Sequence, residues 1–257
     1  MSMIVIGSVK ASPGVTTATL ALGAMWPQGR TALIVELDRA GGDIAARFGL
    51  PSEPGLVSLA AATRHKPDSD GLVWQHAQQL PGGLPVLIAP PSGARTRAAM
   101  AMLQPRLFAD LPDVDVLADL GRVELDDAAA TSLVAAADLV VIAVRPVLAE
   151  LHHLAATAPT IRACNANITV LICGRGSYGR DDVEHGLGID VIGILPHDID
   201  GAEALAGTPT STPGFSRLPL LRSARTLAEG IAGRLHGAET SSADEVDAES
   251  PVAEAVA

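Results

Sequence analysis

The chain has 257 residues, a formal net charge of −11 and a hydrophobic content of 48%. That length fits one α/β domain, or a domain with a tail, and the apolar content is enough for a sizeable core. Aromatic residues make up only 2%, so Ala, Val, Leu and Ile must build the core, which suits helices packed on a parallel sheet. We find no signal peptide and no apolar run of the roughly 18 residues that a membrane span needs, so we expect a soluble, cytoplasmic protein.

Seven short apolar runs rich in β-branched residues predict strands. In chain order they are 3–9, 31–38, 84–90, 114–121, 137–146, 167–176 and 189–196. Alanine-rich segments between them, such as 126–137, favour helices. Strands that alternate with helices predict an α/β fold, with a doubly wound, mostly parallel sheet flanked by helices.

The last predicted helix covers roughly residues 220–235. Leu220, Leu227, Ile231 and Leu235 recur near helical spacing, which predicts a face that packs on the core. A membrane anchor is the alternative, and it is opposed by the acidic stretch that follows. Residues 237–257 contain six acidic side chains, no basic one and no aromatic one. We therefore predict a domain over residues 1–236 and a disordered acidic tail over 237–257.

The stretch VKASPGVTT, residues 9–17, lies between the first predicted strand and a helix predicted over 16–26. Such a loop can bind phosphate, because backbone N–H groups and the helix dipole converge on the anion. Compared with the deviant phosphate-binding loop KGGxGKTT, it keeps Lys10, Gly14, Thr16 and Thr17. Ala11 and Ser12 replace two glycines, Pro13 takes the variable position, and Val15 replaces the loop lysine.

Further candidate groups follow other strands. Asp38, Asp119 and Gly121 all fall at or near the carboxyl ends of predicted strands, as the loop does. Ligands of doubly wound sheets bind beyond those ends. A single acid after a strand is often only a helix cap, whereas the joint placement of these groups predicts a binding site.

Four motifs follow one another along the chain: the loop, ELD at 36–38, ADLG at 118–121 and LPHD at 195–198. With these motifs, residues 1–236 resemble the ParA/MinD superfamily of P-loop ATPases. The resemblance implies the P-loop NTPase fold, ATP and Mg²⁺ as cofactors, and a homodimer. Residues 178–207 further resemble the TadZ/CpaE-like branch, whose members position pilus or secretion machinery.

The resemblance also implies residue roles. Lys10 would reach across a dimer to the partner's nucleotide, and Asp38 would orient the attacking water, while Glu36 stands in for the first acid of that switch. Mg²⁺ would be held by Thr16, Asp38 and Asp119. The implied nucleotide-binding positions are Lys10, Ala11, Ser12, Pro13, Gly14, Val15, Thr16, Thr17, Gly121, Arg175, Pro196 and Asp198.

Val15 brings no charge to the loop. A lysine at roughly 4 Å from a phosphate oxygen contributes enough attraction that its loss should weaken ATP binding by roughly 30- to 1000-fold. Hydrolysis should suffer at least as much, because charge gathers on the γ-phosphoryl in the transition state. Lys10, Arg39 or Arg122 could compensate, although both arginines also fit a solvated or salt-bridged loop role.

We therefore predict a dimeric positioning or recruitment factor that binds ATP weakly, hydrolyses little or none, and acts with a protein partner in a larger machine. The alternative is an active chromosome or plasmid partition ATPase that uses non-specific DNA. Its basic surface would come from Arg217, Arg222, Arg225 and Arg234, but the acidic balance of the chain disfavours DNA. A metabolic ATP-dependent ligase or reductase partner is a third possibility, although such proteins commonly keep a complete loop or add cysteine ligands.

Overall fold

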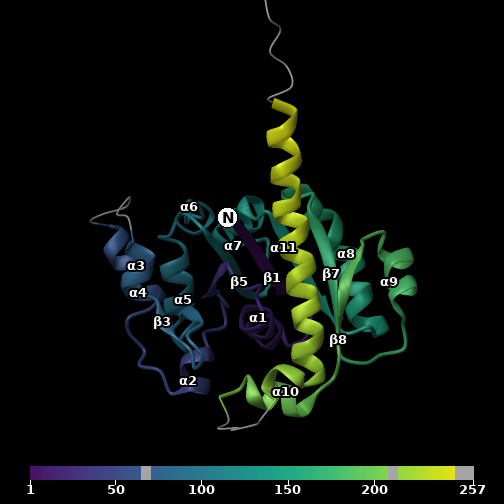
Figure 1. Cartoon of the computed structure of the whole chain (residues 1–257), viewed down its shortest axis with the longest axis horizontal. Coiled ribbons are helices and arrows are strands. Elements are labelled where there is room, and N and C mark those ends of the chain that lie inside the picture. Colours follow the sequence, from purple (N-terminus) through teal and green to yellow (C-terminus); the bar gives the residue numbers. More distant parts are fainter. Residues whose placement is uncertain (65–70, 208–213, 247–257) are drawn as a thin grey trace, which may run out of the picture.

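A computed structural model of the chain describes residues 1–64, 71–207 and 214–246. An eight-stranded sheet runs through it in the order β3-β4-β2-β5-β1-β6-β7-β8 (Figure 1). Within the described residues, every strand pairing is parallel except the antiparallel pairing of β3 with β4 at one edge. The strands are β1 Ser2–Ser8, β2 Thr31–Glu36, β3 Gln78–Gln79, β4 Pro85–Leu87, β5 Val114–Arg122, β6 Leu139–Val144, β7 Ile168–Cys173 and β8 Val191–Leu195.

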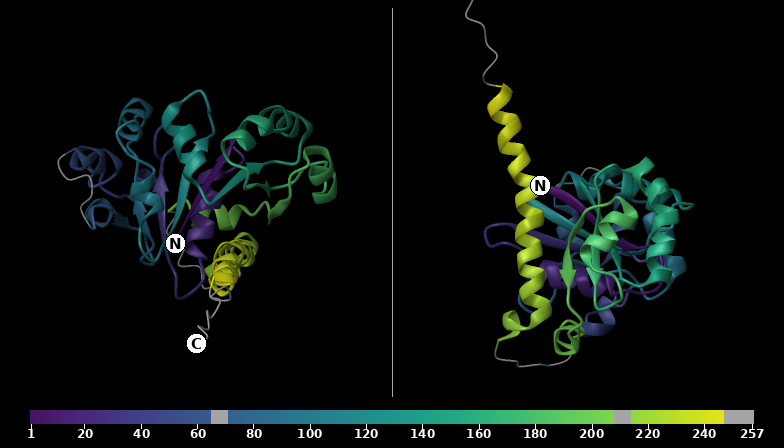
Figure 2. Two further views of the ribbon diagram at one scale, coloured as in Figure 1. Left: turned by 90° about the horizontal axis from the view of Figure 1, so that it is seen from above. Right: turned by 90° about the vertical axis from the view of Figure 1, so that its right-hand side faces the viewer.

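Helices cover both faces of the sheet (Figure 2). The helices of one face are α3 Leu56–Thr63, α4 Leu72–His76, α5 Gly93–Met100, α6 Arg106–Ala109, α7 Ala128–Ala136, α8 Leu148–Cys164 and α9 Arg180–Leu187. The other face carries α1 Val15–Ala24, α2 Ile44–Phe48, α10 Ile199–Ala204, the short 3₁₀-helix η1 Phe215–Arg217 and α11 Pro219–Val246. This arrangement confirms the predicted α/β fold with a doubly wound, mostly parallel sheet.

The alternation of side chains along β1 explains the two layers. Met3 and Val5 pack into the core on one face of the sheet, and Ile4 and Ile6 pack into the core on the other. All four side chains are fully buried, so the central strand is apolar at every one of these positions. This is why the parallel strands read as continuous apolar runs in the sequence.

Each of the seven predicted runs contains a strand, and the sequence analysis missed only β3 among the described strands. Gln78–Gln79 is a two-residue polar strand, too short to produce any hydrophobic periodicity. It pairs with Val86 and Pro85 of β4 and so closes the edge of the sheet. A pairing of this kind depends on the neighbouring strand and not on local sequence.

Helix α11 packs along α1 and β8, as Figure 1 shows. Leu220, Leu227 and Ile231 are buried, which confirms the predicted core-facing stripe. The helix continues beyond residue 236 to Val246, and residues 247–257 lie outside the described residues. The domain boundary at 236 and the disorder of the acidic tail stay predictions. None of the helices within the described ranges is long and apolar enough to cross a bilayer.

A buried carboxylate, Asp115, lies near the amino-terminal end of β5, at the opposite end of the strands from the phosphate-binding loop. It links β5 to the segment after α1 and to α11. Asp115 accepts hydrogen bonds from Trp26 Nε1 at 2.9 Å and from Arg30 Nε at 2.6 Å. His236 Nε2 lies 3.1 Å from the other carboxylate oxygen. The Asp115 side chain is fully buried, and although burial raises its pKa, the bonds from Arg30 and Trp26 outweigh this and hold the pKa below its usual value. The ion pair therefore favours the folded state only while Asp115 is ionised.

Replacing Asp115 by Asn should lower the free energy of unfolding by about 2–3 kcal/mol at neutral pH, since the buried ion pair between Asp115 and Arg30 is lost. The depressed pKa means that this contribution is present above the ordinary aspartate value of 3.8 and is lost as pH falls through the folded value. Urea denaturation of both proteins at pH 7 and near pH 3 measures the difference. The difference in free energy of unfolding between wild type and Asp115→Asn should be smaller near pH 3 than at pH 7. An equal difference at both pH values would contradict the assignment.

Candidate functional site

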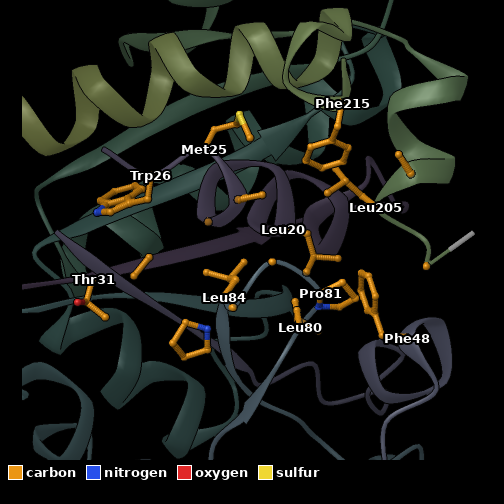
Figure 3. Close-up of a pocket in the computed structure, with 18 of the residues that line it drawn as sticks. Leu20, Met25, Trp26, Thr31, Phe48, Leu80, Pro81, Leu84, Leu205 and Phe215 are labelled. Carbon is orange, nitrogen blue, oxygen red and sulfur yellow. The ribbon is translucent and has the colours of Figure 1, made fainter. Parts of the chain in front are cut away.

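One cavity, of about 1020 Å³, is mainly apolar and lies beside α1. Figure 3 shows Leu20, Met25 and Leu84 gathered at its centre, with Trp26 at one end and Phe48 and Phe215 at the other. Arg30 is the charged residue of its wall, and it is engaged by Asp115. This cavity lacks the donors that an anionic ligand requires, so the candidate phosphate site lies elsewhere.

The predicted phosphate-binding loop connects the end of β1 to the start of α1. Gly14 precedes the helix with φ +95°, and Ala11 adopts φ +59° in the left-handed region. No side chain among the described residues caps the first turn of α1, and that turn contains no acidic residue. The N–H groups of this turn therefore point to a position where an anion can bind.

A cavity of about 350 Å³ lies directly over this turn. Asp38 and Gly121 line it from the ends of two neighbouring strands, as predicted for the carboxyl edge of the sheet. The predicted residues that line it are Ala11, Ser12, Gly14, Val15, Thr16, Thr17, Asp38 and Gly121. The structure therefore brings the loop and both switch-like motifs together.

A second cavity, of about 650 Å³, continues from the first along the loop. The two cavities share Ser12, Gly14, Thr17 and Arg47, and the second extends to Pro13, Pro196 and Asp198. The Asp198 carboxylate is already used within the fold, because it accepts hydrogen bonds from Gly201 N at 3.1 Å and Leu220 N at 3.0 Å. It therefore fixes α10 against α11.

Among the predicted residues that the structure describes, three line neither of these cavities. Lys10 and Arg175 have exposed side chains, whereas Asp119 is buried. Arg145 lines the second cavity from the end of β6, and Glu150 holds its Nε at 2.5 Å. The sequence analysis did not single out Arg145, because no motif marks it.

Asp119 is buried beneath the loop. Its Oδ1 accepts a hydrogen bond from Gly121 N at 3.0 Å, and its Oδ2 is buried with no hydrogen-bond partner in the described part of the chain. Burial raises the pKa of Asp119 to about 7, and the nearby acids Glu36 and Asp38 add to this. Thr16 and the Gly121 N–H act in the opposite direction. A cation at this point would stabilise the ionised carboxylate.

Asp38 lies against Gly121. Its carboxylate accepts a hydrogen bond from Ala40 N at 2.8 Å. A Cβ atom on Gly121 would lie 2.2 Å from the Asp38 Cγ, so only glycine fits between the two switch-like segments. The pKa of Asp38 is raised, mainly by burial and also by Asp43 and Glu124, while Arg122 opposes the shift.

Glu36 does not face the cavity. One carboxylate oxygen accepts hydrogen bonds from Asp43 N at 2.7 Å and Ile44 N at 3.0 Å, and the other accepts one from Ala89 N at 2.9 Å. Burial raises its pKa, and the three backbone donors counteract this. Glu36 therefore holds the start of α2 and the end of β4 in place, a role that its motif did not reveal.

The described side chains do not form a complete metal site by themselves. In residues 1–64, 71–207 and 214–246, no group of three or more His, Cys, Asp or Glu side chains could hold one. The unpartnered Asp119 Oδ2, with Thr16 and Asp38 nearby, does fit Mg²⁺, which usually takes one or two carboxylates and completes its shell with phosphate and water. Mg²⁺ would screen the phosphate charge and these carboxylates from each other.

Three arginines surround the smaller cavity, at positions 39, 47 and 122. Arg39 is salt-bridged to Glu124 and to Asp127, the latter at 3.3 Å. This is the salt-bridged alternative left open for Arg39 by the sequence. Arg47 was not singled out there, since it belongs to no motif and reaches the site only through the fold of α2.

Comparison with solved structures shows which fold this is. The chain is similar to a ParA family ATPase from Chlorobium tepidum, with 15% identity, 87% of this chain and 98% of that chain covered, and a TM-score of 0.65. It is also similar to MinD in a MinC:MinD cell division complex from Aquifex aeolicus, with 16% identity, 91% and 96% coverage and a TM-score of 0.68. A third match is the septum site-determining protein MinD with Mg-ADP from Pyrococcus horikoshii, with 18% identity, 91% and 98% coverage and a TM-score of 0.64. No protein-family profile and no curated protein matches the chain. The chain therefore has the P-loop fold of the ParA and MinD ATPases.

Ala11 occupies a backbone conformation that disfavours a side chain. Replacing it by glycine should raise the free energy of unfolding by about 1 kcal/mol, because the left-handed φ of +59° costs glycine nothing in steric terms. Ser12→Gly is the matched control, since Ser12 is not at positive φ and gains no such relief. Thermal denaturation of the two variants should move the midpoint up for Ala11→Gly only.

Proposed function

We propose that this chain is a nucleotide-dependent positioning or recruitment factor that binds ATP weakly with Mg²⁺ and hydrolyses it slowly or not at all. The observation that carries the proposal is the pair of connected cavities over the uncapped first turn of α1. The smaller one suits a phosphate chain, and the larger one, next to Pro196, suits a ribose and base. One of the similar structures is MinD with Mg-ADP, which supports this choice of ligand.

The weakness of ATP binding follows from Val15. Its side chain is only 6% exposed and packs with the apolar cluster beneath α1. It brings no charge to the phosphate site, and the acids Asp38, Asp43 and Glu124 of the cavity wall balance the three arginines there. A triphosphate therefore meets a wall with no net positive charge, so that Mg²⁺ and the helix N-terminus must provide most of the attraction.

Slow hydrolysis follows from the same deficit. The attack of water on a phosphoryl group builds charge that P-loop enzymes stabilise with the loop lysine and Mg²⁺. Asp38 lies at the cavity, where it could orient the water, but Val15 cannot stabilise the charge that develops. The proposed outcome is an ATP-bound state that persists and acts as a signal.

A dimer and a protein partner complete the proposal. Lys10 is exposed and lines neither cavity of its own chain within the described residues, so its ammonium group is available to a second copy. One similar structure is a MinC:MinD complex, which supports recruitment of another protein as the function. The resemblance of residues 178–207 to TadZ/CpaE-like proteins favours a pilus or secretion machine as the assembly that is positioned.

Restoring the loop lysine tests the proposal. Val15→Lys should tighten Mg-ATP binding by roughly 30- to 1000-fold over a weak wild type, since it adds the missing charge at the phosphates. Isothermal titration with Mg-ATP measures both affinities, and thermal denaturation shows whether the buried lysine is tolerated. Val15→Met is the matched control for size, and it should leave the affinity near that of wild type. A wild type that already binds ATP with micromolar affinity would contradict the weak-binding part of the proposal.

A partition ATPase that uses non-specific DNA remains the second candidate. Arg217, Arg222, Arg225 and Arg234 are all exposed on η1 and α11, which is the observation in its favour. Two of them make contacts, Arg225 Nη2 with the Met25 sulfur at 3.6 Å and Arg234 Nη2 with Asn167 Oδ1 at 2.9 Å.

A gel shift on random duplex DNA separates the two functions. We expect no shift at about 150 mM salt with Mg-ATP present, because the chain is acidic overall. The partition ATPase instead requires a shift of the DNA band that weakens steeply with added salt. The double variant Arg222→Ala, Arg225→Ala should then abolish that shift. Such a result would replace the recruitment factor by the partition ATPase.

A further inference from the structure

We infer that Arg47 supplies the positive charge that the phosphate-binding loop lacks at Val15. The inference rests on the proposed nucleotide function and names the side chain that holds the phosphates. It concerns a residue outside the loop and outside every motif of the sequence. Arg47 is a binding residue in this account and has no part in bond breaking.

The placement of Arg47 is the first argument. It is one of four residues that line both cavities, and the other three, Ser12, Gly14 and Thr17, belong to the loop itself. Arg47 therefore faces the loop from the opposite wall, where the phosphate chain of a nucleotide passes from one cavity to the other. Among the described residues, it is the one charged side chain that both cavities share.

The availability of its charge is the second argument. The Arg47 side chain is 25% exposed, and its Nη2 lies 3.6 Å from Asp43 Oδ2, whose own side chain is 74% exposed. Because Asp43 is mostly exposed, this i,i+4 pair contributes little, and a phosphate can replace Asp43 at small cost. Arg39 is held by Glu124 and Asp127, and Arg145 by the buried Glu150.

Arg122 is the remaining arginine at the site, and it differs from Arg47 in two ways. Arg122 lines the smaller cavity but not the larger one. It also lies close enough to Asp38 to oppose the rise in the pKa of that carboxyl. Its charge therefore acts on Asp38 at the end of the cavity near Gly121. Arg47 lies across from the loop, where the charge of the absent lysine is needed.

The backbone that carries Arg47 is fixed on two sides. Glu36 accepts the N–H groups of Asp43 and Ile44 at the start of α2, one turn before Arg47. A Cβ atom on Gly207 would lie 1.7 Å from the Arg47 carbonyl oxygen, so the segment ending α10 packs tightly on this residue. A side chain that emerges from a fixed backbone is a preorganised donor and loses less entropy on binding.

The chemistry of the guanidinium group specifies the ligand. Its planar fork can donate two parallel hydrogen bonds to phosphate oxygens, and its charge persists at any physiological pH. The position at the junction of the cavities matches a ligand with at least two phosphates. Nucleoside diphosphates and triphosphates should therefore depend on Arg47 far more than a monophosphate does.

Isothermal titration of the full chain with Mg-ATP, and separately with AMP, tests the inference. Arg47→Ala should weaken Mg-ATP binding by about 10- to 100-fold and should change AMP binding little, because charge-assisted bonds to phosphate are lost. Arg47→Lys should lose less Mg-ATP affinity than Arg47→Ala, because it keeps the charge but not the planar fork. Arg95→Ala is the matched control, since Arg95 is exposed, lies 3.9 Å from Glu53, and lines neither cavity. Thermal midpoints show that each variant is folded.

A double variant gives the sharper result. If Arg47 stands in for the lysine, Val15→Lys should restore Mg-ATP binding to Arg47→Ala, and the effects of the two changes should not add. Equal Mg-ATP affinity of wild type and Arg47→Ala would overturn the inference while leaving the proposed function intact, as would an equal loss for AMP and Mg-ATP. A folded wild type that binds no Mg-ATP at millimolar concentration would overturn the proposed function and this inference with it. If Val15→Lys does not fold, the single Arg47 variants and the AMP comparison decide the question.

Discussion

The buried carboxylate of Glu36 is the constraint on which the site depends. Glu36 lies at the end of β2. Its carboxylate accepts hydrogen bonds from N–H groups at the start of α2 and from Ala89 N, so this one side chain connects β2, the start of α2 and the segment after β4. Gly42 passes so close that a Cβ atom there would lie 2.4 Å from Glu36 Oε2. Burial raises the pKa of Glu36, and only the three backbone donors make its charge tolerable in the interior. A neutral residue here would release the segment that carries Asp38 and Arg47.

Around this anchor, the site is acidic at its base and mixed in charge at its rim. Burial raises the pKa of all three acids, Glu36, Asp38 and Asp119. At Asp119, where the pKa is raised to about 7, Glu36 and Asp38 add to the rise. Such carboxylates repel a triphosphate unless Mg²⁺ lies between them. The rim supplies arginines, of which Arg39 is committed to internal ion pairs. A phosphate at this loop would therefore need Mg²⁺ from solution and, as proposed, a cation from outside the loop.

The opposite edge of the sheet has a separate polar anchor. Asp115, near the start of β5, binds Trp26 and Arg30 from the segment between α1 and β2, and His236 reaches it from α11. The apolar cavity beside α1 begins at this end with Trp26 and Arg30 and extends to Phe48 and Phe215. One helix thus has its N-terminus at the phosphate site and its C-terminal side held by a buried ion pair. Within the described part of the chain, no side-chain cap occupies the N-terminus of α1, so its N–H groups stay open to an anion.

The sequence by itself determined the α/β architecture and predicted a candidate phosphate site at the carboxyl ends of the strands. Apolar runs of β-branched residues marked seven strands, because both faces of a parallel strand are buried and leave a continuous signal. The carboxyl ends of such strands meet at one edge, so Asp38, Asp119 and Gly121 were expected beside the loop, and Asp38 and Gly121 do line its cavity. Only the tertiary structure decided the positive φ of Ala11, the capping role of Glu36, the use of Asp198 within the fold and the approach of Arg47. These features arise where segments distant in sequence meet, and a local pattern carries no record of which backbone groups or charges the fold will bring together.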